Sequence, residues 1–404
     1  MRRIFLIGLA LVSLFSSSGL SQEKYKLGLQ IRYRFELDDK DFNQETAPND
    51  FNLLRTRLAV TLTPSSDLEG FVQIQDARVY GEETGTLADG SADNLDLHQA
   101  YFLVKNLGKL PVDLKAGRME VSYGSERFIG AVGWSNIGRA FDGGILRLRQ
   151  DRFTLDVFNL KEVELQQTGD TGDRNVIGFN ADLKLVAAQT TQVFLLWQRM
   201  QPTQQLNRFT PGMYLSGKEG GFRHTVELAY QFGKVEEMDV AAYLFALNVG
   251  YTFRKTRMQP DLSAGAEYLS GDDDPEQGDY KVFDTMYPTG HKFHGFMDYF
   301  INIPAHTYGL GLFDLHAGLT LNPCDKSAVN VVYHHFESTQ KFTLNDGSTS
   351  KAFGDEVDLT ANHHYNDYLA ITLGASLFAP GEIFKQSKGE DTSTWFYVMA
   401  QVNL

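Results

Sequence analysis

The segment Leu27-Gly-Leu-Gln-Ile-Arg-Tyr-Arg-Phe-Glu-Leu37 decides the fold class. Apolar side chains occupy every second position, and the positions between them carry Gln30, Arg32, Arg34 and Glu36. Successive side chains of a β-strand point to opposite faces, so this strand has one apolar face and one charged face. Arginine and glutamate are rarely buried in the core of a water-soluble sandwich. A barrel that crosses a membrane needs this pattern, with lipid outside and water inside.

The same alternation recurs along the chain. It is clearest at 54–62, 177–185, 226–232, 243–253, 313–321, 369–377 and 394–404. The interleaved positions are polar or very small and do not form a second apolar face. Short turns alternate with mostly longer connections, as periplasmic turns and outer loops do in outer-membrane barrels. The expected long loops are 38–50, 81–94, 124–142, 164–174, 270–307, 337–351 and 379–391.

The fold class predicted from this pattern is all-β, a transmembrane antiparallel β-barrel. We count about eighteen strands, with sixteen as the alternative. The weakest spans are 68–80, 112–123 and 208–217, and Pro211 weakens the last of them. The first and last strands are expected to pair, because an open sheet edge does not survive in lipid.

The first residues predict export. Residues 1–21 combine a charged start, a short apolar stretch and small residues, so we expect a cleaved signal peptide and a barrel over 22–404. No later segment offers about 18 uninterrupted apolar residues for a transmembrane helix. The formal charge of −14 argues against nucleic acid as a partner, and the lone Cys324 excludes an intrachain disulfide. The expected location is the outer membrane of a Gram-negative bacterium.

Two stretches of the chain contain recognisable sequence motifs. Residues 95–149 contain Leu97-His-Gln-Ala-Tyr101, Gly117-Arg118, Tyr123-Gly-Ser-Glu-Arg127, Trp134-Ser-Asn and Gly138-Arg-Ala-Phe-Asp142, and residues 263–298 contain Glu267-Tyr-Leu-Ser-Gly-Asp272, Tyr287-Pro-Thr-Gly-His291 and Gly295-Phe-Met-Asp298. These motifs resemble those of the alginate-export family of outer-membrane porins. The resemblance implies a monomeric barrel of about eighteen strands that passes polysaccharide or small solutes. It places Arg118, Arg127 and Arg139 at motif positions, and in the alginate exporter an Arg-rich constriction attracts the anionic polymer.

Nine arginines are candidates for lining the pore and selecting anions. Four of them lie on the polar faces of neighbouring strands, two follow in a later strand, and three are expected to enter with the third long loop: Arg32, Arg34, Arg55, Arg57, Arg147, Arg149, Arg118, Arg127 and Arg139. Guanidinium groups stay charged and bind carboxylates with two hydrogen bonds, so a ring of them in a pore selects anions. The alternative is that they pair with acids and stiffen the wall; the candidate acids are Glu36, Glu69, Asp76, Asp96 and Asp113.

Two long loops are candidates for narrowing the bore. Loop 124–142 is rich in Gly, Trp and Arg, and we expect it to fold inward. The alternative is a surface loop packed on its own Trp134 and Phe141. Loop 270–307 is long enough to act as a lid or plug.

The sequence gives little support for a bound metal or cofactor. Asp272, Asp273 and Asp274 are a weak Ca²⁺ candidate, because the stretch departs from the EF-hand template at its sixth and twelfth positions. Otherwise they form a solvated acidic tip. The pairs His334-His335 and His363-His364 cannot both face the bore, and neither these pairs nor His291 and His294 predict a metal site.

The predicted function is passive passage of anionic solutes or acidic polysaccharide through the outer membrane, with periplasmic export proteins as candidate partners. The alternatives are a general small-solute porin, or an adhesin or outer-membrane enzyme. An enzyme is not expected, because Gly133-Trp-Ser135-Asn-Ile137 lacks the final glycine of a nucleophile elbow.

Overall fold

The computed structural model describes residues 24–80, 93–163, 173–201, 205–274 and 277–404. These residues form one antiparallel sheet of eighteen strands in which each strand pairs with its sequence neighbours and β1 also pairs with β18. The predicted fold class and strand number are therefore confirmed. The expected signal peptide, residues 1–21, and most of the expected loops 81–94 and 164–174 lie outside the described residues.

The strands alternate with connections that differ in length at the two ends of the barrel. The strands are β1 (Tyr25–Asp39), β2 (Asn49–Ser65), β3 (Leu68–Tyr80), β4 (Asp93–Val104), β5 (Val112–Met119), β6 (Phe141–Arg149), β7 (Phe153–Val163), β8 (Asp173–Leu183), β9 (Gln189–Gln201), β10 (Leu206–Glu219), β11 (Phe222–Val235), β12 (Met238–Thr252), β13 (Asp261–Leu269), β14 (Leu312–Cys324), β15 (Ser327–Thr343), β16 (Thr349–His364), β17 (Leu369–Pro380) and β18 (Ser393–Asn403). The short helices of the described residues are η2 (Leu107–Lys109), η3 (Gly290–Lys292), α2 (Ile303–His306) and α3 (Glu382–Ser387). Within the described ranges, no helix is long and apolar enough to cross a membrane.

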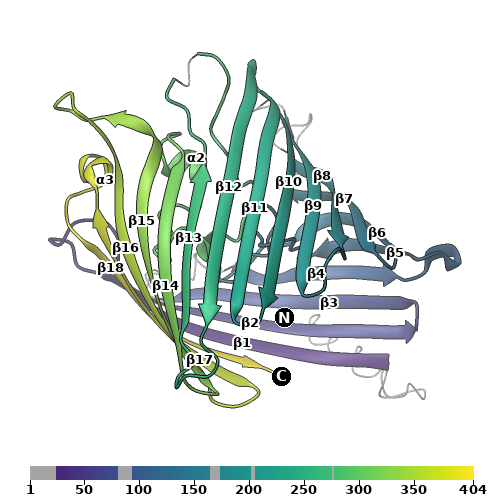
Figure 1. Cartoon of the computed structure of the whole chain (residues 1–404). Helices are drawn as coiled ribbons and strands as arrows, with labels where there is room; N and C mark the ends of the chain where they lie inside the picture. The colour runs from purple at the N-terminus through teal and green to yellow at the C-terminus, as the bar shows by residue number, and fades with distance from the viewer. Residues whose placement is uncertain (1–23, 81–92, 164–172, 202–204, 275–276) are drawn as a thin grey trace.

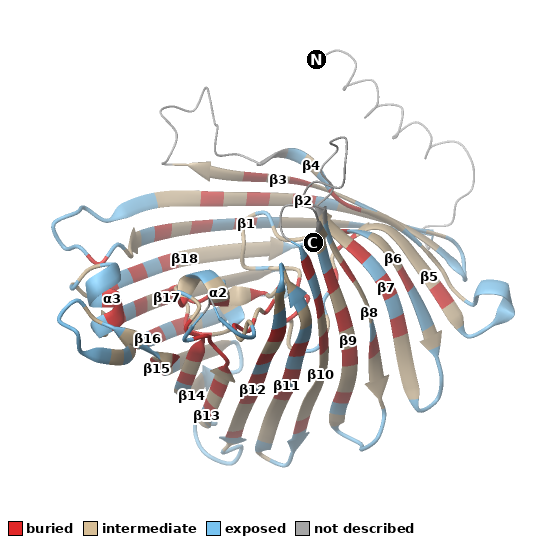
Figure 2. Ribbon diagram, turned by 90° about the horizontal axis from the view of Figure 1, so that it is seen from above, coloured by how far each residue is buried: buried red, intermediate tan, exposed pale blue. Residues whose placement is uncertain are grey.

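The barrel closes where the two ends of the strand series meet. β18 runs antiparallel to β1, from Asn403 opposite Gln30 to Thr394 opposite Asp39. Figure 1 shows the resulting continuous sheet from the side, and Figure 2, seen from above, shows α2 and coil segments inside the ring of strands. Closure leaves no sheet edge exposed to lipid, as expected from the sequence.

The two faces of each strand differ as the alternation predicts. On β1, Arg32 and Arg34 are 3% and 4% exposed, whereas Tyr33 between them is 46% exposed. Outward apolar side chains recur around the sheet, among them Leu58, Tyr230, Phe245, Leu315, Leu359 and Leu373. These side chains form the outer face, which contacts hydrocarbon in a bilayer.

Two expected boundaries are wrong. The chain at 337–351 is not a long loop, because β15 and β16 continue through it and still pair at Thr343 and Thr349. Register shifts between Phe336 and Phe342 interrupt the side-chain alternation, so the sequence pattern did not predict that the strands extend this far. The strand expected over 112–123 ends at Met119, after which the chain turns into the barrel.

Pro211 lies within β10 without breaking it. The residue pairs with Leu195 of β9, whereas the register with β11 passes over Thr210 and Pro211 and resumes at Gly212 opposite Ala229. Since proline has no N–H group, it is tolerated where a ladder hydrogen bond is absent.

The interior is occupied by two connections, 120–140 between β5 and β6 and the described residues of 270–311 between β13 and β14. They pair with each other through a parallel bridge from Ile129 to Tyr287 and a hydrogen bond from the Tyr287 N–H to the Phe128 carbonyl, 3.1 Å long. Connection 381–392, which contains α3, completes an aromatic cluster in which Phe300, Phe336, Phe353, Phe378 and Phe384 are at most 1% exposed. Burial of this cluster inside the barrel holds the inward loops in place.

Candidate functional site

Four of the candidate arginines form one surface on the inner face of β1 and β2. We call this surface the arginine wall: Arg32, Arg34, Arg55 and Arg57. Pairing of the two strands places Arg32 opposite Arg55, and alternation directs all four side chains inward. Each of the four residues is at most 7% exposed.

The arginine wall holds loop 120–140 through the backbone of residues 133–137. Arg32, for example, donates to the carbonyl oxygens of Gly133 and Ser135 at 2.7 and 2.8 Å. Charged donors make stronger hydrogen bonds than neutral ones, so these contacts hold the loop firmly inside the bore. The wall-to-loop hydrogen bonds at 2.7–3.1 Å run from Arg32 to Gly133 and Ser135, from Arg34 to Trp134, from Arg55 to Ser135 and from Arg57 to Ile137.

Two charges of the arginine wall have no carboxylate in contact within the described part of the chain. Arg34 and Arg57 each contact a glutamate, at 2.7 and 3.0 Å. Arg32 and Arg55 instead donate to neutral oxygens, and their buried Nε atoms have no hydrogen-bond partner among the described residues. The guanidinium charges of these two residues are therefore not neutralised by direct pairing.

Glu120, at the start of loop 120–140, links the wall to β4. Its carboxylate contacts Arg57 at 3.0 Å and His98 at 2.8 Å. Burial would raise the pKa of Glu120, but the hydrogen bond with His98 and the charge of Arg57 outweigh that effect and lower it. This carboxylate is therefore held in its charged form.

Three other candidates do not join the arginine wall. Arg118 lies on the outer face of β5, opposite the inward and fully buried Met119, and contacts Asp142 at 2.7 Å. Arg147 and Arg149 point inward on β6, where each contacts an aspartate of a neighbouring strand, at 2.7 and 2.9 Å. For these three residues, the structure shows the acid pairing that was the alternative to anion selection.

Arg127 does not belong to the arginine wall, and its side chain reaches the opposite side of the bore. Its guanidinium contacts Glu227 of β11 and Glu267 of β13, each at 2.7 Å, and lies 4.0 Å from the ring centre of Phe293. Burial would lower the pKa of Arg127, but the two carboxylates outweigh that effect and raise it. Arg127 is thus a buried link between loop 120–140 and the far wall.

Buried acids line the inner face of the barrel between β11 and β16. We call the set the acidic wall: Glu227, Glu267, Asp314, Glu356 and Asp358, carried by β11, β13, β14 and β16. Each of these residues is at most 9% exposed.

The acidic wall holds connection 270–311 through backbone N–H groups. The Met297 N–H donates to Glu356 at 2.8 Å, and the Phe296 N–H donates to Asp358 at 3.3 Å. The side chain of His294 adds a contact of 2.7 Å to Glu267. The two walls therefore hold the two inward loops by opposite charges.

A cavity of about 750 Å³ lies between the two inward loops and the arginine wall. The Trp134 ring stacks on His291, with ring centres 4.1 Å apart, and the Arg34 guanidinium lies 3.9 Å from the Trp134 ring centre. Arg139 donates to the Pro288 carbonyl at 3.1 Å, and burial lowers the pKa of its guanidinium. The charged residues among the cavity lining are Arg34, Lys40, Arg139, Arg174, Glu36, Glu162, Asp284 and Asp298.

The acidic tip at 272–274 is held by its own turn. Asp272 is 4% exposed and accepts hydrogen bonds from the backbone N–H groups of Asp274 and Lys281, both at 3.1 Å. The carboxylate of Asp273 lies 4.0 Å from the Lys281 amine. The structure therefore uses Asp272 to shape the start of connection 270–311.

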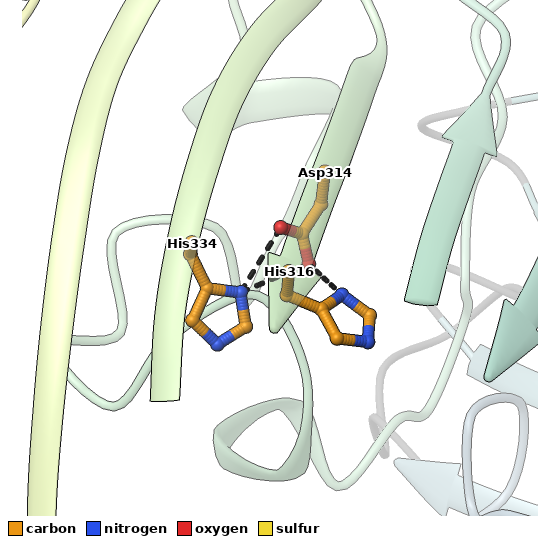
Figure 3. A group of neighbouring side chains, drawn as sticks. All are labelled: Asp314, His316 and His334. Atoms are coloured by element: carbon orange, nitrogen blue, oxygen red, sulfur yellow. Dashed lines mark hydrogen bonds and ion pairs between the residues drawn. The ribbon is translucent and has the colours of Figure 1, made fainter. Parts of the chain in front are cut away.

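The histidine pair on β15 splits between the two faces, as alternation requires. His334 points inward and contacts Asp314, whereas His335 points outward and contacts Asp355 at 2.8 Å. Inward His316 completes a cluster with Asp314 and His334, shown in Figure 3. Sequence analysis missed this cluster, although Asp314 and His316 are two residues apart and share one face of β14.

Comparisons with known proteins agree with this architecture. OccK3 (OpdO) of Pseudomonas aeruginosa has a TM-score of 0.63 and 12% identity, over 95% of this chain and 96% of that chain. OccAB4 of Acinetobacter baumannii has a TM-score of 0.63 and 11% identity, over 94% and 98%. The outer membrane protein OprD from Pseudomonas aeruginosa has a TM-score of 0.63 and 12% identity, over 96% of both chains. No curated protein matches the sequence.

The family comparison extends the structural one. At 11–12% identity the solved structures show a shared fold. The alginate export family matches residues 23–398, which is nearly the whole barrel. Fold and family are those of passive channels in the Gram-negative outer membrane, and such channels are not enzymes. In that membrane, lipid surrounds the barrel and solutes pass through it. The chain belongs to the alginate export family.

Proposed function

We propose that this outer-membrane channel prefers anionic solutes, including acidic polysaccharide, and that the arginine wall supplies the preference. The observation that carries the proposal is the pair of uncompensated charges at Arg32 and Arg55. Both guanidinium groups lie beneath residues 133–135, and Ser135 also lines the 750 Å³ cavity. Charges act over longer distances in a partly dry interior than in water, so the cavity experiences a positive potential.

The cavity offers further features that suit an acidic sugar. Arg139 and Arg174 line it together with the Trp134 ring. Arginine binds carboxylates with two hydrogen bonds, and an aromatic face packs against the apolar face of a ring. We further propose that one chain forms the working pore, because its sheet closes within the chain, and that periplasmic export proteins deliver polymer to it.

A planar-bilayer measurement tests the proposal. The reversal potential in a KCl gradient is compared for the unaltered channel, Arg32→Gln/Arg55→Gln and Arg32→Lys/Arg55→Lys. The lysine pair keeps the charge but loses the planar fork that binds the loop carbonyls. We expect chloride preference in the unaltered channel and the lysine variant, and a shift toward potassium in the glutamine variant.

The same experiment contains the contradicting result. Cation preference in the unaltered channel would overturn the proposal, and so would equal reversal potentials in the glutamine and lysine variants. Arg118→Gln is the matched control, because that arginine lies on the outer face and its loss leaves the bore unchanged. Block of the current by uronate oligomers then tests the polysaccharide part of the proposal.

A general small-solute porin is the second candidate. The acidic wall faces the same bore as the arginine wall, and opposed walls produce a transverse field without a net preference for either sign. A reversal potential close to zero, unchanged by Arg32→Gln/Arg55→Gln, would favour this reading.

A further inference from the structure

Three side chains on the inner face of β14 and β15 share an unusually compact arrangement. The Asp314 carboxylate contacts Nδ1 of His334 at 3.0 and 3.1 Å and Nδ1 of His316 at 3.2 Å. Figure 3 shows both imidazole rings turned toward this one carboxylate. Strand pairing explains the arrangement, because His316 lies directly opposite His334 and Asp314 lies two residues before His316.

The spacing of the donor atoms fits a metal ion. The three residues can offer one ligand atom each with all three atoms within 4.8 Å of one another. A tetrahedral zinc ion with bonds of about 2.0–2.2 Å holds its ligand atoms about 3.3–3.6 Å apart. The two Asp–His contacts of 3.0–3.2 Å are close to that separation, and the two histidine nitrogens lie within 4.8 Å of each other. A metal would take the place of the protons that now lie between Asp314 and the two imidazoles.

The second ring nitrogen of His316 has a hydrogen-bond partner, and that of His334 has a charged neighbour. Asn248 contacts Nε2 of His316 at 2.9 Å. Nε2 of His334 lies 4.0 Å from the carboxylate of Asp358, which is itself held by the Phe296 N–H. Metal-ligating histidines almost always have their second nitrogen hydrogen-bonded, which fixes the ring and raises its basicity, and the Asn248 contact does this for His316.

The surroundings favour a cation and leave it accessible. The cluster lines a cavity of about 270 Å³ whose other lining residues include Glu227, Glu267 and Arg127. The acidic wall contributes four carboxylates besides Asp314, and Arg127 compensates two of them. Two histidines and one carboxylate, with a cavity on the open side, are a common ligand set for first-row divalent metals.

We propose that Asp314, His316 and His334 form a binding site for a first-row divalent transition metal of the zinc type in the wall of the channel. The bound ion adds two positive charges to the acidic wall and ties β14 to β15. The competing explanation is a set of shared protons that only stiffens the wall.

Cobalt and zinc binding distinguish these explanations. The chain is purified in detergent without a polyhistidine tag, stripped with chelator and titrated with Co²⁺ at pH 7.5, followed by visible absorption and then by Zn²⁺ displacement. We expect one Co²⁺ per chain with a visible ligand-field band that Zn²⁺ abolishes. Binding should weaken strongly at pH 5.5, because the imidazoles must give up their protons to bind.

Variants locate the site. His316→Ala and Asp314→Asn should each weaken Zn²⁺ binding by about 100-fold or more, since outer-shell partners alone account for about 10–100-fold. His335→Ala is the matched control, because His335 neighbours His334 but lies on the outer face beside Asp355. Its affinity should equal that of the unaltered chain.

Two results would overturn the proposal. One is the absence of a ligand-field band in the unaltered chain with Co²⁺ at millimolar concentration. The other is binding that His316→Ala and Asp314→Asn leave unchanged while both variants keep the heat-dependent gel mobility of a folded barrel. If both variants fail to fold, His316→Gln is tested in their place. The presence or absence of the Co²⁺ ligand-field band in the unaltered chain still tests the proposal.

Discussion

The arginine wall, on β1 and β2, and the acidic wall, between β11 and β16, line the same bore and hold their loops in complementary ways. The arginine wall donates to carbonyl oxygens of residues 133–137, whereas the acidic wall accepts from the N–H groups of Phe296 and Met297. Backbone offers both kinds of group in every residue, so either charge can hold a loop inside a barrel. What differs is the field that remains after the loop is bound.

The charge left over differs between the two walls. Arg32 and Arg55 donate their hydrogen bonds to neutral oxygens, and in our proposal their positive charges therefore act on the cavity. On the far side, Arg127 offsets Glu227 and Glu267, and two histidines surround Asp314. The comparison teaches that one inward loop, 120–140, serves both walls: its residues 133–137 cover the arginines without neutralising them, and its Arg127 offsets two of the acids.

The largest effect is expected from Arg127→Gln. Removing this cation leaves Glu227 buried without a cation and Glu267 with His294 alone, and breaking such a buried pair costs about 3–5 kcal/mol. Arg118→Gln is the control, since its exposed pair with Asp142 is worth about 0–1 kcal/mol. Apparent melting temperatures by circular dichroism compare the two, and equal shifts would show that Arg127 is not a buried link.

A smaller effect is expected from Gly295→Ala. Gly295 has a φ of +82°, and an added Cβ would lie 2.5 Å from the Glu356 carboxyl group, so the contact with the acidic wall is lost. Backbone strain alone costs about 1–3 kcal/mol. We expect connection 270–311 to become sensitive to protease and the single-channel conductance to rise.

Gly347→Ala separates backbone strain from that contact. Gly347 has a φ of +83°, but an added Cβ there meets nothing within 4 Å. The control should therefore lose stability while conductance and protease sensitivity stay unchanged. A rise in conductance in both variants would contradict the role given to the acidic wall.

The smallest effect is expected from Trp134→Leu. The ring joins the two inward loops through His291, and such aromatic pairs contribute about 0.5–1.5 kcal/mol. Its loss should increase current fluctuations in single-channel recordings without unfolding the barrel. Trp197→Leu, on the outer face beside Phe209, should leave the recordings unchanged; increased noise in both variants would point to a general loss of stability.

The sequence predicted the barrel well because alternation is a local signal. Arg32 and Arg34 could be assigned to the inner face from their neighbours alone, and the spacing of turns gave the strand number. Alternation failed at 337–351, where register shifts break the period of two. The motif position of Arg118 placed that residue in the pore, although it lies on the outer face of β5.

The site was less predictable because its partners are distant in the chain. Arg127 meets Glu227 and Glu267, which lie 100 and 140 residues away, and no local pattern indicates such contacts. The pairing of His316 with His334 depends on the register between β14 and β15. The backbone carbonyls that the arginines bind have no sequence signature, because every residue carries one.

The opposed potentials of the two walls can be measured directly with thiol reagents. In a Cys324→Ser background, Ser135→Cys and Val332→Cys place one thiol in each cavity, and anionic and cationic methanethiosulfonates are compared at each position. The unaltered chain, in which the native Cys324 is exposed, supplies the reference ratio of the anionic to the cationic reaction rate. Relative to it, the anionic reagent should react faster at position 135 and slower at position 332. Equal ratios at the two positions would contradict opposed walls and, with them, the proposed origin of anion preference.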